Sequence, residues 1–206
     1  MLESYITIHH YASYEYEDRK SIFIGEAMPV STEEDALHFI ETVKKKYPDA
    51  RHHVYAYVLR ETSIMRFTDD GEPQGTAGMP VLDIIRKNGL TDIAIVVTRY
   101  FGGTLLGTGG LVRAYTAAAL GAVENAEIIT YDTYVTLNIE ATYSDFQKFT
   151  PVFQEMGFRS EDTRYTDKVI VSGSIRKSCS DSLIDKLVQI TSARVKVQII
   201  DEKFDF

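Results

Sequence analysis

The fold is decided by residues 93–115, which read IAIVVTRYFGGTLLGTGGLVRAY. An apolar run at 93–98 leads into a glycine-rich turn, and the turn leads into small residues with helical spacing. Because the run is apolar at successive positions, both of its faces must be covered, and we expect a central strand in a sheet. The order strand, turn and helix brings the free N–H groups of a helix start close to the end of that strand.

This stretch is also unusual in its charge. Between Asp92 and Glu124 there is no acid and no lysine, and the only charged residues are Arg99 and Arg113. Two guanidinium groups beside free backbone N–H groups favour an anion-binding site for a phosphate or a carboxylate. We expect Thr108 to be the N-cap of the helix. The candidate site comprises Arg99, Tyr100, Gly102, Gly103, Thr108, Gly109, Gly110 and Arg113.

Known nucleotide fingerprints do not fit the segment. Gly102 and Gly107 have the spacing of the first part of a P-loop, but Thr108 stands where the phosphate-binding lysine would be. A G-x-G-x-x-G spacing is also missing there. The alternative interpretation is that the glycines serve only tight turns.

Composition restricts the class of protein. The chain has 206 residues, of which 44% are apolar and 25% charged, and its net charge is −8. Such an acidic chain is not expected to coat nucleic acid through a wide basic surface, and no DNA specificity is expected. The single Cys179 cannot form an internal disulfide, and no apolar run has the roughly 20 residues that a membrane span needs. We expect a cytoplasmic protein without a membrane partner.

Outward from the central stretch, the pattern predicts two domains, 1–131 and 132–206, in an α+β protein. The first domain is expected to hold strands at 4–10, 21–28, 53–59, 63–68, 93–98 and 127–131, and helices after 31, from 81 to 88 and from 108 to 123. Ser31 and Glu34 are expected to form a capping box at the first helix. The second domain is expected to follow the order βαββαβ, with strands at 134–141, 159–166, 169–175 and 194–201 and helices at 143–156 and 180–190. That order is the ferredoxin-like plan.

Other reactive groups are interpreted as structural. The turn with Asp69, Asp70 and Glu72 could hold a divalent cation, but a solvated turn is the preferred interpretation. Neither the adjacent histidines 52 and 53 nor Cys179 has a nucleophile or a base nearby in sequence. We therefore expect no catalytic residue, no metal and no cofactor.

The motifs resemble those of the IMPACT family. The matching blocks are DDGEP at 69–73, GTAG at 75–78, VVTRYFGG at 96–103, LG at 106–107, GGL at 109–111 and AY at 114–115, with RHH at 51–53 upstream. They extend over residues 17–125 and add Thr76 and His52 to the candidate site. Residues 133–206 resemble the C-terminal domain of bacterial members.

The resemblance implies both a fold and a role. It implies a first domain similar to domain two of ribosomal protein S five and to domain four of elongation factor G, and a second domain similar to that factor's ferredoxin-like domain five. Eukaryotic members act in translational control, but this chain lacks their RWD domain. The expected function is therefore a non-catalytic regulator of translation, with the ribosome, RNA or a translation-associated protein as partner.

Two other functions stay open at this point. One is an enzyme acting on a small phosphorylated or nucleotide substrate, since small-molecule kinases also use an S-five-like domain. The other is a pure protein-interaction module, in which neither arginine would matter for binding.

Overall fold

The computed structural model describes residues 4–205, and these divide into two compact units. The N-terminal unit is Ile6–Thr130. The C-terminal unit consists of residues 131–205 together with Ser4 and Tyr5. The chain is a mixed α+β protein with two antiparallel sheets, which confirms the expected fold class.

The N-terminal unit is built on a five-stranded sheet in the order β2-β3-β6-β4-β5. Its strands are β2 (Ala12–Asp18), β3 (Ser21–Pro29), β4 (His52–Leu59), β5 (Ile64–Thr68) and β6 (Ile93–Tyr100), and its helices are α1 (Glu33–Lys46), α2 (Gly78–Lys87) and α3 (Gly107–Asn125). Strand β6 is central, as predicted, and its residues from Ile93 to Arg99 are buried. Because β6 is central and covered on both faces, its side chains are apolar at successive positions.

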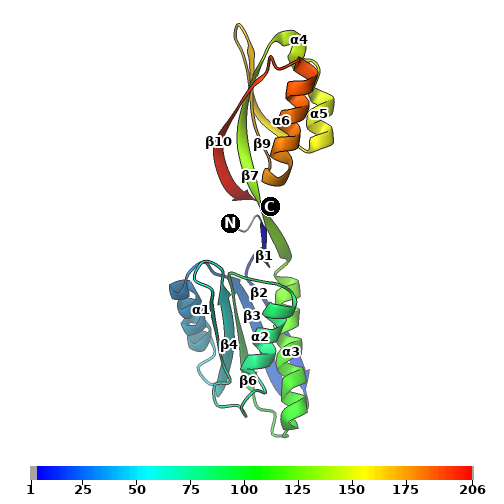
Figure 1. Cartoon of the computed structure of the whole chain (residues 1–206). Helices are drawn as coiled ribbons and strands as arrows, with labels where there is room; N and C mark the ends of the chain where they lie inside the picture. Colours follow the sequence, from blue (N-terminus) through cyan, green and yellow to red (C-terminus); the bar gives the residue numbers. More distant parts are fainter. Residues whose placement is uncertain (1–3, 206) are drawn as a thin grey trace. The chain divides into compact units, whose positions relative to one another are not determined.

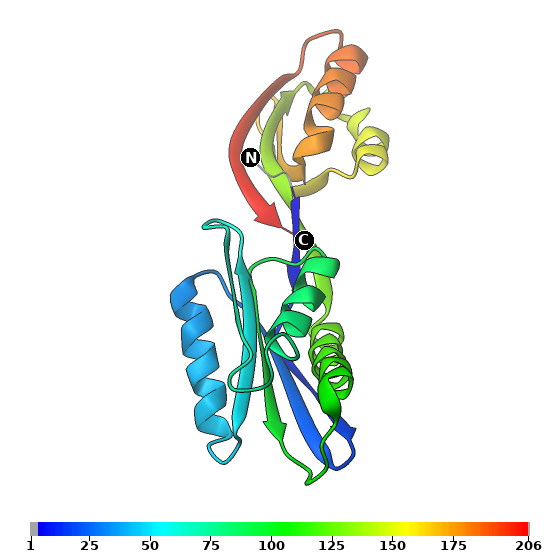
Figure 2. The same ribbon diagram turned by 60° about the horizontal axis from the view of Figure 1, so that its bottom comes forward.

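Helices cover both faces of this sheet (Figures 1 and 2). Ile93, Ile95 and Val97 of β6 pack in one core with α2 and α3, whereas Ala94 and Val96 pack in a second core with α1. The approach of α3 to the sheet is close. A Cβ on Gly25 of β3 would stand 2.2 Å from the carbonyl oxygen of Ala118, so only glycine permits this contact.

The C-terminal unit has the strand order β10-β7-β9-β8, with each neighbouring pair antiparallel. Its strands are β7 (Ile128–Ala141), β8 (Arg159–Tyr165), β9 (Val169–Arg176) and β10 (Lys196–Asp205), its helices are α4 (Tyr143–Phe146), α5 (Phe149–Met156) and α6 (Lys177–Thr191), and β1 (Ser4–Ile8) also pairs with β7. Helices α5 and α6 share one core with the inner strands. The predicted ferredoxin-like arrangement is therefore present.

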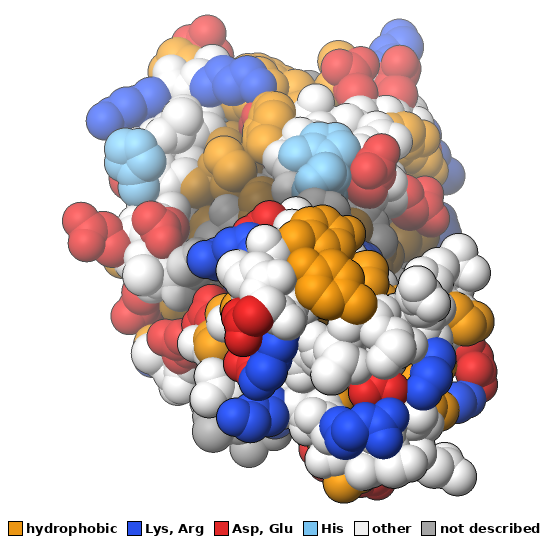
Figure 3. Space-filling model, turned by 90° about the horizontal axis from the view of Figure 1, so that it is seen from above, with side chains coloured by type: hydrophobic (Ala, Val, Ile, Leu, Met, Phe, Trp, Pro, Cys, Tyr) orange, Lys and Arg blue, Asp and Glu red, His pale blue; other side chains and the backbone are white. Residues whose placement is uncertain are grey.

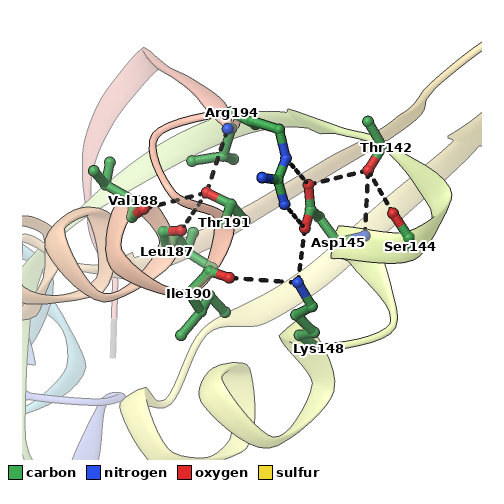
Figure 4. A network of polar contacts seen from close by, with 10 residues as sticks. Thr142, Ser144, Asp145, Lys148, Leu187, Val188, Ile190, Thr191 and Arg194 are labelled. Carbon is green, nitrogen blue, oxygen red and sulfur yellow. Dashed lines mark hydrogen bonds and ion pairs between the residues drawn. The ribbon is translucent and has the colours of Figure 1, made fainter.

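A buried carboxylate ties α4 to the segment that follows α6 (Figure 4). Asp145 has a side chain that is 1% exposed, and it accepts two hydrogen bonds from Arg194, at 3.0 and 2.8 Å, and one from Lys148 at 2.9 Å. Thr142 also donates to it at 3.0 Å. The hydrogen bonds from Arg194, followed by those from Lys148, hold the pKa of Asp145 well below its usual range. The ionised carboxylate is thus part of the folded structure.

Four local predictions were wrong. Strand β2 was not predicted, and the strands expected at 127–131 and 134–141 are one continuous strand, β7. The helix expected at 143–156 is divided into α4 and α5. The capping box of α1 is formed by Thr32 with Asp35, one residue beyond the predicted pair of Ser31 and Glu34.

Candidate functional site: the glycine loop and the start of helix α3

The glycine loop, residues 101–110, connects the end of β6 to the first turn of α3. Gly103 and Gly107 have φ values of 84° and 69°, a left-handed conformation that favours glycine. Gly102 has no room for a side chain, because a Cβ there would stand 2.0 Å from the carbonyl carbon of Lys20. These three glycines are therefore required by the backbone, and their presence alone does not indicate a ligand.

Helix α3 begins one residue earlier than predicted. Leu106 is its N-cap, with no side-chain hydrogen bond, and Thr108 lies inside the first turn. The prediction that Thr108 caps the helix was wrong. The consequence is that no side chain caps the first N–H groups of α3, so they can donate to a bound group or to solvent.

Arg99 is part of the core of the unit. Only 6% of the residue is exposed, and its Nη1 donates to Oε1 of Glu72 at 2.6 Å. Its guanidinium carbon lies 5.4 Å from the ring centroid of Phe23 and 5.5 Å from that of Phe101. The same carboxylate oxygen accepts the hydroxyl of Tyr115 at 2.7 Å. Arg99 and Arg113 therefore do not form one open site, which corrects the prediction that both would grip the same anion.

The acidic turn before α2 has a structural role that neither interpretation of the sequence included. Asp69 accepts hydrogen bonds from the backbone N–H groups of Gly75, Ala77 and Gly78, at 2.8, 3.1 and 2.8 Å. Asp70 accepts the N–H of His53 at 2.6 Å. Together with Glu72, all three carboxylates are engaged by donors of the protein itself.

The remaining candidates near this turn are partly or wholly covered. Nδ1 of His52 lies 2.8 Å from the carbonyl oxygen of Asp70, and Thr76 is buried with its hydroxyl donating to the carbonyl of Pro73 at 2.7 Å. Tyr100 is half-buried, and its ring meets that of Tyr47 edge-on. His52 and Thr76 are thus joined to the acidic turn and contribute to its conformation.

The exposed part of the candidate site consists of the glycine loop and Arg113. The side chain of Arg113 lies back along the first turn of α3, with Nη1 3.6 Å from the place that a Cβ would take on Gly109. Arg113 is exposed, and no acidic side chain of residues 4–205 forms an ion pair with it. Gly103, Thr108 and Gly109 are exposed in the same segment.

The structure adds basic and apolar residues that the sequence did not indicate. Arg19 and Lys20 form the turn between β2 and β3, and Nη1 of Arg19 lies 3.5 Å from the carbonyl oxygen of Leu105 in the loop. Phe101 is 51% exposed and Leu105 is 81% exposed. The loop therefore offers apolar contacts within reach of cationic groups. The missed strand β2 explains why Arg19 and Lys20 were not placed here.

One group of side chains in residues 4–205 has the geometry to hold a metal ion. His9, His10 and Glu127 are exposed, and their potential ligand atoms lie within 4.8 Å of one another. Glu127 follows the end of α3, whereas the glycine loop precedes its start, about 28 Å away along the helix. This group is separate from the glycine loop.

Comparisons with known proteins identify both units. The model of the Impact N-terminal domain matches residues 19–123, and that of a domain of unknown function, DUF1949, matches residues 139–194. The IMPACT family member YvyE of Bacillus subtilis is 32% identical over 199 residues, which are 96% of this chain and 92% of that protein. YigZ of Escherichia coli is 47% identical over 102 residues, 48% of this chain and 50% of that protein.

More distant relatives match one unit, and one solved structure matches both. Protein IMPACT of Bos taurus is 31% identical over 96 residues, 44% of this chain and 30% of that protein. A crystal structure described as that of a hypothetical protein has a TM-score of 0.61 and 28% identity, and covers 98% of this chain and 99% of its own. Within residues 4–205, no helix combines the length and the apolar content that a membrane span requires.

Proposed function

We propose that this chain, which belongs to the IMPACT family, is a non-catalytic regulator of translation. It binds ribosomal RNA or a ribosome-associated protein through the glycine loop, the first turn of α3 and Arg113. The observation that carries the proposal is Arg113 itself, an exposed guanidinium without an acidic partner that lies along uncapped backbone N–H groups. Phosphate groups bind at such places.

The surroundings of Arg113 support a nucleic-acid backbone as the ligand. The glycine loop carries no acid, and Arg19 and Lys20 lie beside it. The exposed ring of Phe101 can stack on a base, a contact that tolerates any sequence. With only three basic side chains at the site, we expect weak binding and a shallow dependence on salt.

The enzymatic alternative has less support. Near the glycine loop, the carboxylates of Asp69, Asp70 and Glu72 each accept hydrogen bonds from the protein. The remaining candidate base there, His52, contacts the carbonyl oxygen of Asp70 through Nδ1. These contacts give each group a structural role in the acidic turn. Binding without turnover is therefore the function that the geometry supports better.

Co-sedimentation with ribosomes at low salt tests the proposal. We expect the parent protein to sediment with ribosomes, and Arg113→Gln to weaken this binding by about tenfold, the effect of one charge-assisted hydrogen bond. Arg86→Gln is the matched control, because Arg86 is also an exposed arginine of this unit but lies on α2, paired with Asp83 at 3.9 Å. Failure of the parent to sediment, or equal binding by Arg113→Gln, would contradict the proposal.

A further inference from the structure

The C-terminal unit contains a cavity of about 500 Å³. Six of its lining residues come from β7, α5, β8, β9 and the turn after α5, and they are Tyr134, Phe153, Met156, Phe158, Arg159 and Arg176. The three residues from α5 and the turn are apolar, whereas the other three are polar or charged. A cavity of this size is typical of binding sites for small organic molecules.

The polar side of the cavity is organised by Tyr134. The residue is 3% exposed, and its hydroxyl oxygen accepts hydrogen bonds from Nη2 of Arg159 at 3.3 Å and from Nε of Arg176 at 3.4 Å. The guanidinium of Arg159 also lies over the Tyr134 ring, 5.0 Å from its centroid. In residues 4–205, no acceptor receives the hydrogen of this buried hydroxyl. Because Tyr134 lines the cavity, its hydroxyl can donate this hydrogen to a bound ligand.

The two arginines keep donors available for a ligand. Arg176 lies 3.1 Å from Asp132 through Nε, and Arg159 lies 3.9 Å from Asp205 through Nη1. Both arginine side chains are more than half exposed, so these ion pairs are weak and can rearrange. Among residues 4–205, no hydrogen bond is formed by either Nη atom of Arg176. Because guanidinium groups bind phosphate through paired N–H donors, the two arginines suit a phosphate group.

The start of α6 adds positive potential to that of the two arginines. Helix α6 follows Arg176 directly, and Arg176 is its N-cap without a side-chain hydrogen bond to the first turn. Cys179 of that turn also lines the cavity. The positive end of the helix dipole is therefore close to the two guanidinium groups, where it favours a negatively charged ligand.

From the cavity and from the two arginines that meet at the Tyr134 hydroxyl, we propose that the C-terminal unit binds a small phosphate monoester with a flat apolar part, such as a nucleoside monophosphate. The phosphate is held by Arg159 and Arg176 and accepts the Tyr134 hydroxyl. The flat apolar part packs on Phe153, Met156 and Phe158. This site lies in a different unit from the glycine loop. The proposal of a phosphate site therefore does not depend on the outcome of the ribosome experiment.

Calorimetric titration of the full chain with AMP, GMP, CMP and UMP, one at a time, tests the proposal. We expect saturable binding of at least one of the four, much weaker binding of its nucleoside, and weaker binding of inorganic phosphate, which lacks the apolar part. If none of the four saturates at millimolar concentration, the proposal is overturned. It is also overturned if the nucleoside binds as tightly as its monophosphate, since the arginines would then have no role.

Variants locate the site. Arg176→Gln and Arg159→Gln should each weaken binding of the monophosphate by about tenfold or more, and Tyr134→Phe should weaken it severalfold while keeping the packing of the ring. Arg164→Gln is the matched control, because Arg164 is an exposed arginine of the same strand, β8, that does not line the cavity. Circular dichroism checks that each variant is folded. Unchanged affinity in both cavity arginine variants would overturn the assignment of the site.

Discussion

Arg99 belongs to the motif that predicted an anion site, but its burial gives it a structural role. Its pair with Glu72 is almost completely covered, with side-chain exposures of 7% and 4%, and Tyr115 donates to the same carboxylate. Burial, followed by the hydrogen bond to Glu72, raises the pKa of Tyr115, so this hydroxyl keeps its proton. The motif residues Arg99, Glu72 and Tyr115 are thus joined in one structural network.

We therefore predict that Arg99→Ala acts on stability. The substitution leaves the Glu72 carboxylate buried without its cation, and breaking a buried pair in this way costs about 3–5 kcal/mol. Urea unfolding measures the change. Tyr115→Phe should cost less, about 1.5–3 kcal/mol, because it removes one hydrogen bond to a charged group. An Arg99→Ala variant that is as stable as the parent but binds ribosomes poorly would contradict this prediction and show that Arg99 is part of the binding site.

The sequence could identify these residues but not their pairing. Arg99 and Glu72 are 27 positions apart, and only the packing of the acidic turn against the end of β6 brings them together. Composition alone made the acidic turn look solvated. Arg113 was easier to place, because it follows the glycine turn within the same predicted helix and no nearby acid could neutralise it. Local spacing thus predicted the exposed arginine, whereas a long-range contact decided the buried one.

At the scale of elements, Asp69 connects the acidic turn to helix α2. Ala77 is the N-cap of α2 and has no side-chain hydrogen bond, and Asp69 instead accepts the N–H groups of Ala77 and Gly78 from outside the helix. We predict that Asp69→Ala lowers the free energy of unfolding by about 1–2 kcal/mol, the usual effect of losing a helix cap.

Chemical denaturation with and without Mg²⁺ checks this prediction. Because the Asp69 carboxylate is engaged by N–H donors, Mg²⁺ should not alter the stability difference between Asp69→Ala and the parent. Asp49→Ala is a control, since Asp49 is an exposed acid outside the turn. A stability deficit that appears only with Mg²⁺ present would show that the turn binds the metal after all.

Elements with a clear hydrophobic pattern were predictable, and those without one were not. Strand β6 was placed in the centre of its sheet because it is apolar on both faces. Strand β2 alternates tyrosine with exposed glutamate, and its hairpin turn is made by Arg19 and Lys20, which have positive φ without being glycine. The alternation is a strand signal that was not used in the prediction, whereas a turn of arginine and lysine is not a usual hairpin signal. Strand β7 was predicted as two strands divided at the polar Asp132, although the strand is continuous from Ile128 to Ala141 and its pairing with β10 reaches that residue.

At the scale of the whole molecule, each unit has its own hydrophobic core. The cores of the N-terminal unit contain residues from Ile8 to Ala126, and the core of the C-terminal unit contains residues from Val135 to Val195. The change of rhythm near residue 132 was enough to predict two domains. The exact boundary between the two units could not be predicted. It falls within strands β1 and β7, and neither strand changes in composition at the boundary.

Separate cores predict two unfolding transitions in calorimetry, and Asp145 identifies one of them. Its pKa is lowered in the folded state by Arg194 and then by Lys148, so its contribution to stability is complete above the ordinary aspartate pKa and is lost as the pH falls toward the folded value. Between neutral pH and about pH 3, one transition of the parent should therefore fall by several degrees more than the same transition of Asp145→Asn. Arg99→Ala should lower the other transition and leave this one in place. A single transition that both variants shift together would mean that the continuous strands β1 and β7 couple the two units into one cooperative structure.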